Sequence, residues 1–218
     1  MTHPSVYART QPDKIAYRMA GSGKAITYRE LDELSNQGAH LFRSLGLKAG
    51  DHIAFLIENR LAFMEICWAA QRSGLYYTAI SRYLTRDEIG YIVKDCGARV
   101  VITSPTCAEQ IRGLVRGAPD EPLFFMLDEP LPGFRSWDKE ALARPATPIA
   151  DEEAGYDMLY SSGTTGRPKG IKRQSEHNPI ELPNPFLKIL CADMCGMNSE
   201  ASICRRRRSI TQHRCAST

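Results

Sequence analysis

The region from His52 to Leu127 alternates short apolar runs with segments of helical periodicity, and this alternation restricts the possible folds most strongly. The apolar runs have the length of β-strands and lie at residues 52–57, 75–80, 99–103 and 123–127. Between them, apolar residues recur every three or four positions, which indicates helices at residues 59–72, 85–94 and 106–116. Strands that alternate with helices in this way are typical of βαβ units. We therefore predict an α/β fold in which a parallel sheet carries helices on both faces.

The residues before this region predict a β-hairpin followed by a capped helix. Two short strands flank a turn at residues 21–24, which contains two glycines. Thr27 and Glu30 have the spacing of a capping box, so a helix is expected to begin there, and Gly46 is placed to end it. The same capping spacing recurs at Thr85, before the helix expected at residues 85–94.

A stretch rich in serine, threonine and glycine begins at Ser161 and ends at Gly170. Glycines let a backbone approach a ligand closely, and hydroxyls, backbone N–H groups and a lysine can all donate to phosphate oxygens. The spacing G-x-x-G-x-x-K differs from the Walker pattern, so the usual P-loop is excluded. A flexible linker is the alternative, but the apolar strand expected at residues 158–160 and the Pro-Lys-Gly at the end favour a defined loop. The candidate phosphate-binding residues are Ser161, Ser162, Gly163, Thr164, Thr165, Gly166 and Lys169.

Residues 160–171 match the pattern aromatic-Thr/Ser-Ser-Gly-Thr-Thr-Gly-x-Pro-Lys-Gly-Val/Ile at every defined position, and this pattern resembles the loop of the AMP-forming acyl-CoA synthetases. Residues 27–31 and 47–51 resemble two further segments of that adenylate-forming superfamily, in the same order. The resemblance implies an acid–CoA ligase whose loop holds the β- and γ-phosphates of ATP while a carboxylate attacks the α-phosphate. It also implies Mg²⁺ and coenzyme A as cofactors, with Lys169 as the catalytic candidate.

By this resemblance, residues 1–200 form part of an AMP-binding (adenylation) domain, because members of the family are more than twice as long as this chain. Family segments that bind magnesium, hold the ribose and carry the lysine of a C-terminal lid have no counterpart here. We therefore expect the chain to be inactive alone, and an exposed sheet edge to favour self-association. The expected substrate is a carboxylic acid. Residues 181–186 resemble bacterial fatty acyl-CoA synthetases most, which favours a fatty acid, and an aryl acid is the alternative substrate.

The basic residues are distributed unevenly along the chain. Its net charge is +3, but residues 201–218 hold five arginines, four of them consecutive at 205–208, and no acidic residue. The remainder is therefore mildly acidic. Such a tail could bind nucleic acid, so a basic-tailed nucleic-acid binder is one alternative function. A non-catalytic nucleotide- or protein-binding module is another.

A frameshift is the second hypothesis for this tail. One possible coding sequence for the family's continuation, Leu-Ser-Pro-Ala-Pro-Leu-Tyr-His-Ala-Ala-Pro-Leu-Arg, encodes residues 204–216 when it is read one base later. We therefore expect a single-base frameshift near residues 199–203 and a non-homologous, disordered tail at 201–218 with no specific nucleic-acid partner.

The seven cysteines include no C-x-x-C pair, so they do not have the pattern of a disulfide framework. The cysteines and histidines after residue 190 match no common zinc module, and we predict no metal site. Three cysteines are expected to be small buried residues: Cys67, Cys96 and Cys107. Three scattered histidines are not expected to form a site: His40, His52 and His177. No apolar run reaches the ~20 residues of a transmembrane helix, and no secretory signal is visible, so we expect a cytoplasmic protein.

Overall fold

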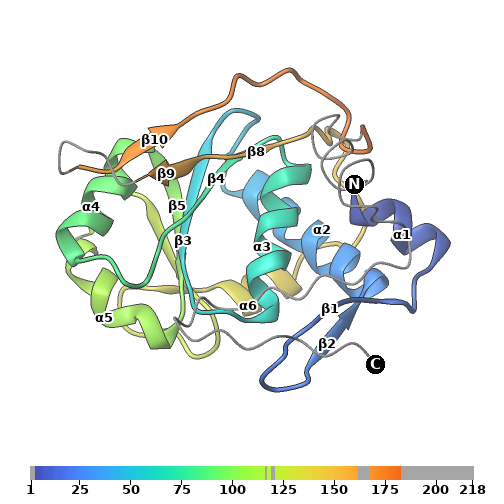
Figure 1. Cartoon of the computed structure of the whole chain (residues 1–218), viewed down its shortest axis with the longest axis horizontal. Helices are drawn as coiled ribbons and strands as arrows, with labels where there is room; N and C mark the ends of the chain where they lie inside the picture. Colours follow the sequence, from blue (N-terminus) through green and yellow to red (C-terminus); the bar gives the residue numbers. More distant parts are fainter. Residues whose placement is uncertain (1–2, 116, 119–120, 162–166, 183–218) are drawn as a thin grey trace, which may run out of the picture. The chain divides into compact units, whose positions relative to one another are not determined.

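A six-stranded parallel sheet forms the centre of the computed structural model, which describes residues 3–115, 117–118, 121–161 and 167–182 (Figure 1). The strand order is β7-β6-β5-β3-β4-β8, and every neighbouring pair is parallel. The strands are β3 (His52–Leu56), β4 (Tyr76–Ala79), β5 (Ala98–Thr103), β6 (Leu123–Met126), β7 (Arg135–Ser136) and β8 (Tyr156–Asp157). All described residues belong to one unit of the chain, Thr2–Leu182. The predicted α/β fold is therefore confirmed.

Helices cover both faces of this sheet, as Figure 1 shows. On one face lie α2 (Tyr28–Ser44), α3 (Leu61–Arg72) and α6 (Trp137–Leu142); on the other lie α4 (Arg86–Asp95) and α5 (Ala108–Ile111). Along β3, Ile53 and Phe55 pack in the hydrophobic core beneath α2, α3 and α6. Ala54 and Leu56 pack in the core beneath α4 and α5, on the other face. This alternation explains why the sequence of β3 is almost uniformly apolar, since each face of the strand is buried.

The N-terminal elements form the hairpin and the capped helix that the sequence predicts. Strands β1 (Ile15–Arg18) and β2 (Ala25–Thr27) pair in antiparallel orientation. The capping boxes that begin at Thr27 and Thr85 are both present, and Gly46 follows α2 with a φ of 77°. An additional helix, α1 (Pro4–Thr10), was not predicted. It begins with a proline, and the side chain of the preceding residue, His3, caps the helix by accepting the Ser5 N–H.

The helix predicted at residues 106–116 is wrong. The structure instead has three short turns in succession: η1 (Pro105–Cys107), α5 and η2 (Arg112–Leu114). Gly113 lies inside this segment, where a glycine disfavours a continuous helix, and Pro105 begins a 3₁₀ turn rather than an α-helix. Apolar spacing is present in either case, because the turns still bury Cys107, Ala108 and Ile111.

Both edges of the sheet are short. The edge strands β7 and β8 contain two residues each, which leaves few unpaired backbone groups for a second chain. Self-association through a sheet edge therefore stays a prediction. Among the described residues, no helix combines the length and apolar composition that crossing a membrane requires.

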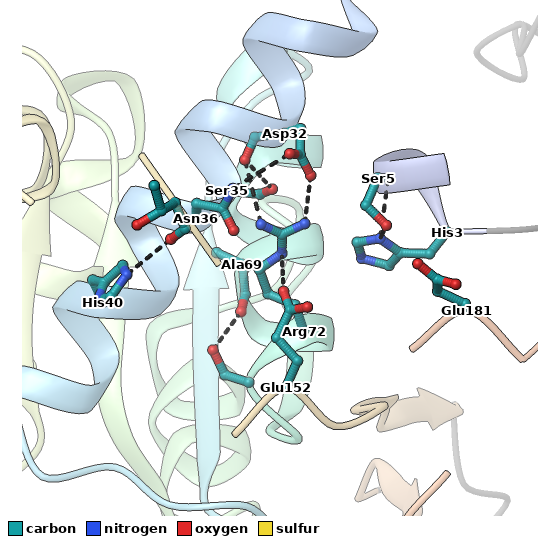
Figure 2. A network of polar contacts seen from close by, with 12 residues as sticks. His3, Ser5, Asp32, Ser35, Asn36, His40, Ala69, Arg72, Glu152 and Glu181 are labelled. Atoms are coloured by element: carbon teal, nitrogen blue, oxygen red, sulfur yellow. Dashed lines mark hydrogen bonds and ion pairs between the residues drawn. The ribbon is translucent and has the colours of Figure 1, made fainter. Parts of the chain in front are cut away.

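A buried arginine joins three parts of the fold. The Arg72 side chain, at the end of α3, has no exposed surface. Its guanidinium donates to Asp32 Oδ1 of α2 at 2.5 Å and lies 3.4 Å from Glu152 Oε1, in the segment before β8. Figure 2 shows the guanidinium between these two carboxylates. Burial raises the pKa of Glu152, and the charge of Arg72 opposes this. The ion pairs therefore hold the start of β8 against α2 and α3.

Replacing Arg72 with leucine should be strongly destabilising. The leucine fills much of the space but leaves Asp32 and Glu152 without their cation, which should cost about 3 kcal/mol of unfolding free energy. Urea unfolding of the whole chain measures this. Arg29→Leu is the matched control: its ion pair with Asp13 is largely exposed, so it should cost less than about 1 kcal/mol. Equal costs for the two variants would contradict the central role of the Arg72 network.

Candidate functional site

A second β-hairpin carries the serine- and glycine-rich loop. Strands β9 (Leu159–Ser161) and β10 (Lys169–Ile171) pair in antiparallel orientation, and Ser161 lies directly opposite Lys169. The structure thus brings these two candidate residues together at the end of the hairpin. The other five candidates lie outside the described residues: Ser162, Gly163, Thr164, Thr165 and Gly166. The strand predicted at residues 158–160 is displaced by one residue and belongs to this hairpin, not to the parallel sheet.

The hairpin follows the last strand of the parallel sheet and continues in the direction of the sheet's carboxyl edge. Strand β8 runs parallel to β4 and ends at Asp157, which lies opposite Tyr77 near the start of β4. The next residue, Met158, donates its N–H to the Tyr77 carbonyl at 2.9 Å, and its own carbonyl accepts from the Thr78 hydroxyl at 3.0 Å. These contacts fix where β9 leaves the sheet. Ligand-binding loops in α/β folds are expected at this edge.

The charges at the hairpin suit a polyphosphate. Lys169 and Arg167 are both exposed, and no carboxylate among the described residues lies within ion-pair distance of either. The Ser161 hydroxyl adds a donor opposite Lys169. Cations and hydroxyls without competing carboxylates are the donors that phosphate oxygens need, so these residues fit the phosphates of ATP. Among the described residues, no group of three or more His, Cys, Asp or Glu could hold a metal ion.

Gly170 explains why the end of the motif needs a residue without a side chain. It pairs with Tyr160 across the hairpin. A Cβ added at Gly170 would lie 2.9 Å from Tyr160 Cζ and 2.5 Å from Met158 Cε. Since real Cβ atoms do not approach so closely, any larger residue would displace the Tyr160 ring. Glycine at this position therefore leaves room for the Tyr160 ring beside β10.

A polar cluster at the switch point of the sheet was missed by the sequence analysis. Strands β3 and β5 are neighbours whose following helices lie on opposite faces, an arrangement that often marks a ligand site. Here Arg60 donates to both oxygens of Asp128 at 2.8 Å and to Glu58 at 3.3 Å, and Ser104 donates to Glu58. These side chains satisfy one another just beyond the ends of β3, β5 and β6. Only their position directly after the apolar runs could have indicated the cluster.

Glu65, on α3, has an unusual environment near this cluster. Burial, with a smaller contribution from the charge of Asp138, raises the pKa of Glu65 to about 7, while Arg60 opposes the shift. The carboxyl is thus held partly protonated near neutral pH. Because Glu65 lies on α3, on the face of the sheet that α2 and α6 also cover, and not at the hairpin, we do not assign it to the phosphate site.

A groove of about 890 Å³ lies at the opposite edge of the sheet, beside the first residues of β5 and β6. Its lining is mostly apolar, as at Leu123 and Phe124, and it also includes two cations and one carboxylate: Lys94, Arg99 and Glu121. Since the hairpin leaves the carboxyl edge, this groove at the amino edge is separate from the candidate residues.

The scattered histidines and cysteines make separate contacts. The imidazole of His40 contacts the Thr147 carbonyl at 2.9 Å, His52 stacks on Tyr76, and His177 pairs with Glu153 at 2.7 Å. The three cysteines expected to be buried are confirmed as buried free thiols: Cys67, Cys96 and Cys107.

Comparison with known proteins gives consistent matches. The model of a family described as AMP-binding enzyme matches residues 5–178. A feruloyl-CoA synthase of an Amycolatopsis species is 31% identical over 163 residues, which cover 75% of this chain and 30% of that protein. A long-chain-fatty-acid–CoA ligase of Mycobacterium tuberculosis (strain ATCC 25618 / H37Rv) is 29% identical over 181 residues, covering 78% of this chain and 33% of the ligase. The chain therefore spans about a third of the length of these curated relatives.

A solved structure gives the same fold. The anthranilate CoA ligase AuaEII, in complex with anthranoyl-AMP, superposes with a TM-score of 0.67 at 24% identity. The superposition covers 78% of this chain and 34% of the ligase. At this identity the likeness shows the α/β fold alone, which agrees with the parallel sheet described above.

The pH dependence of unfolding tests the environment of Glu65. In the unfolded chain this carboxyl ionises near its ordinary pKa of 4.5, whereas the folded protein keeps the proton to about pH 7. Raising the pH across this window should therefore favour the unfolded state. Glu65→Gln removes the titration, so its stability relative to the wild type should rise by about 2 kcal/mol between pH 4.5 and 7. A stability difference that does not change with pH would contradict this environment.

Proposed function

Because the chain belongs to the AMP-binding enzyme family, we propose that it holds the phosphates of ATP in an acid–CoA ligase that forms AMP. The observation that carries this proposal is the β9–β10 hairpin, which places Ser161 opposite the exposed Lys169 where the motif predicts a phosphate-binding loop. Since the chain spans about a third of its curated relatives, the activity of the whole enzyme is part of the proposal.

The hairpin residues would act by binding and orienting phosphate. When bound, ATP would supply an electrophilic α-phosphate that the carboxylate substrate attacks with release of pyrophosphate, and transfer of the acyl group to coenzyme A would release AMP. Lys169 would neutralise charge on the phosphate oxygens, and the Ser161 hydroxyl would donate a hydrogen bond from the facing strand. Among the described residues, no group of three or more His, Cys, Asp or Glu offers ligands for Mg²⁺.

We propose a fatty acid as the substrate. The support is the resemblance of residues 181–186 to fatty acyl-CoA synthetases, together with the similarity to the mycobacterial long-chain ligase. The feruloyl-CoA synthase is about equally similar, which keeps aryl acids as the second candidate. We also propose that the AMP-binding region ends before residue 201 and that the arginine-rich residues 201–218 have no part in phosphate binding.

Lys169→Ala should weaken ATP binding by about tenfold, because it removes one charge-assisted contact to phosphate. Isothermal titration calorimetry of the 218-residue chain with ATP and Mg²⁺ measures the affinity. The affinity of the wild type should also fall as salt is added, since exposed charges are screened.

Lys48→Ala is the matched control for this experiment. It removes the same charge from an exposed position near the amino edge of the sheet, so ATP affinity should not change. A wild-type chain that does not bind ATP, or equal effects of the two substitutions, would refute the proposed role of Lys169.

The 218-residue chain alone should not catalyse acid-dependent exchange between pyrophosphate and ATP. Phosphate contacts by themselves do not accelerate adenylation, because in-line attack also needs the acid to be positioned and the developing charge to be neutralised. Exchange of labelled pyrophosphate into ATP, with and without a panel of fatty and aryl acids, checks this. Measurable exchange that Lys169→Ala abolishes would show that the described hairpin belongs to a complete catalytic site.

A further inference from the structure

Residues on both sides of the serine- and glycine-rich segment contact the same helix. Before the loop, the Tyr160 hydroxyl donates to Asp95 Oδ2 at 2.6 Å. After the loop, the Arg167 guanidinium lies over the Tyr91 ring, 5.6 Å from its centroid. Tyr91 and Asp95 are one turn apart on α4, and the Tyr91 hydroxyl donates to Asp95 Oδ1 at 3.3 Å. Four side chains therefore form one connected group between α4 and the hairpin.

The position of Asp95 is not explained by the stability of its own helix. It is the last residue of α4, where the helix dipole disfavours a negative charge. Each of its carboxylate oxygens instead accepts a hydrogen bond from a tyrosine. Burial raises the pKa of Tyr160, and the nearby Asp95 adds to the shift, so the phenol remains a donor at neutral pH.

The hairpin is built to make this contact. The Tyr160 ring lies against Gly170 of the paired strand β10, where any Cβ would collide with it. Tyr160, Tyr91 and Met158 all pack against the hydrophobic core on the α4 face of the sheet. Thus the ring is seated by packing as well as by its hydroxyl.

We propose that Asp95 and Tyr91 are positioning residues for the β9–β10 hairpin, because they hold Tyr160 and Arg167 against α4. Ser161 directly follows Tyr160, and Lys169 lies two residues after Arg167. Holding Tyr160 and Arg167 in place would therefore keep Ser161 and Lys169 opposite each other across the hairpin. This inference rests on the proposed function for its effect on ATP, but the anchoring of the hairpin can be measured without any ligand.

Hydrogen exchange of the full 218-residue chain, resolved by nuclear magnetic resonance, tests the anchoring. Tyr160→Phe keeps the ring but removes the donor, and Asp95→Ala removes the acceptor. Each should speed exchange of the protected amides in residues 159–161 and 169–171 by about tenfold, while strand β3 is unaffected. Asp95→Asn keeps one acceptor oxygen for Tyr160 and should restore much of the protection.

Tyr17→Phe is the matched control, because it also removes a phenol, in this case the one that accepts the Trp68 indole N–H at 2.9 Å. It should leave exchange at the hairpin unchanged. Unchanged hairpin exchange in both Tyr160→Phe and Asp95→Ala would overturn the proposal, and so would an equal increase in Tyr17→Phe.

Titration with ATP and Mg²⁺ tests the consequence for binding. Tyr160→Phe and Asp95→Ala should each weaken ATP binding about tenfold, Asp95→Asn less, and Tyr17→Phe not at all. Faster hairpin exchange with unchanged ATP affinity would overturn the positioning role. If the wild-type chain does not bind ATP, the proposed function fails, and the exchange measurements alone decide whether α4 anchors the hairpin.

Discussion

Strand β3 is buried along its whole length, and the arrangement of the other elements follows from this requirement. Because both of its faces are apolar, it needs helices on both sides and a parallel neighbour at each edge, which β4 and β5 provide. Parallel strands place all their carboxyl ends at one edge of the sheet. Because β8 is parallel to these strands, the hairpin that follows it continues toward the same edge, where the loops after the other strands also lie.

The hairpin depends on contacts that are distant in the sequence. Arg72 ties the segment before β8 to α2, and the Gly155 N–H donates to the Gln71 carbonyl at 2.6 Å. A Cβ at Gly155 would lie 2.3 Å from the Leu75 carbonyl oxygen, so only glycine allows this approach. On the other side of the hairpin, Tyr160 reaches α4. A buried charge, close backbone packing and one phenol thus fix the position of the β9–β10 hairpin.

Local patterns in the sequence predicted much of the fold. Apolar runs and capping residues act over a few positions, so β3 to β6 and the starts of α2 and α4 were correctly expected. The motif also pointed to Ser161 and Lys169, although it did not predict that they face each other across a hairpin. Strand β10 was missed because Lys169–Ile171 has only one large apolar residue. The contact between Asp95 and Tyr160 was beyond sequence reasoning. Tyr160 occupies the aromatic position of the motif, but Asp95 lies 65 residues away and no local pattern marks it as a partner.

The central claim is that polyphosphate binds at the β9–β10 hairpin, at the carboxyl edge of the sheet. The most direct measurement is residue-by-residue mapping of amide chemical shifts while ATP and Mg²⁺ are added to the isotope-labelled chain. The account predicts that, among the residues the structure describes, the largest chemical-shift changes occur at Ser161, Arg167 and Lys169. Shifts concentrated instead at Leu123 and Phe124, in the groove at the amino edge, or at the Arg60 cluster would contradict it.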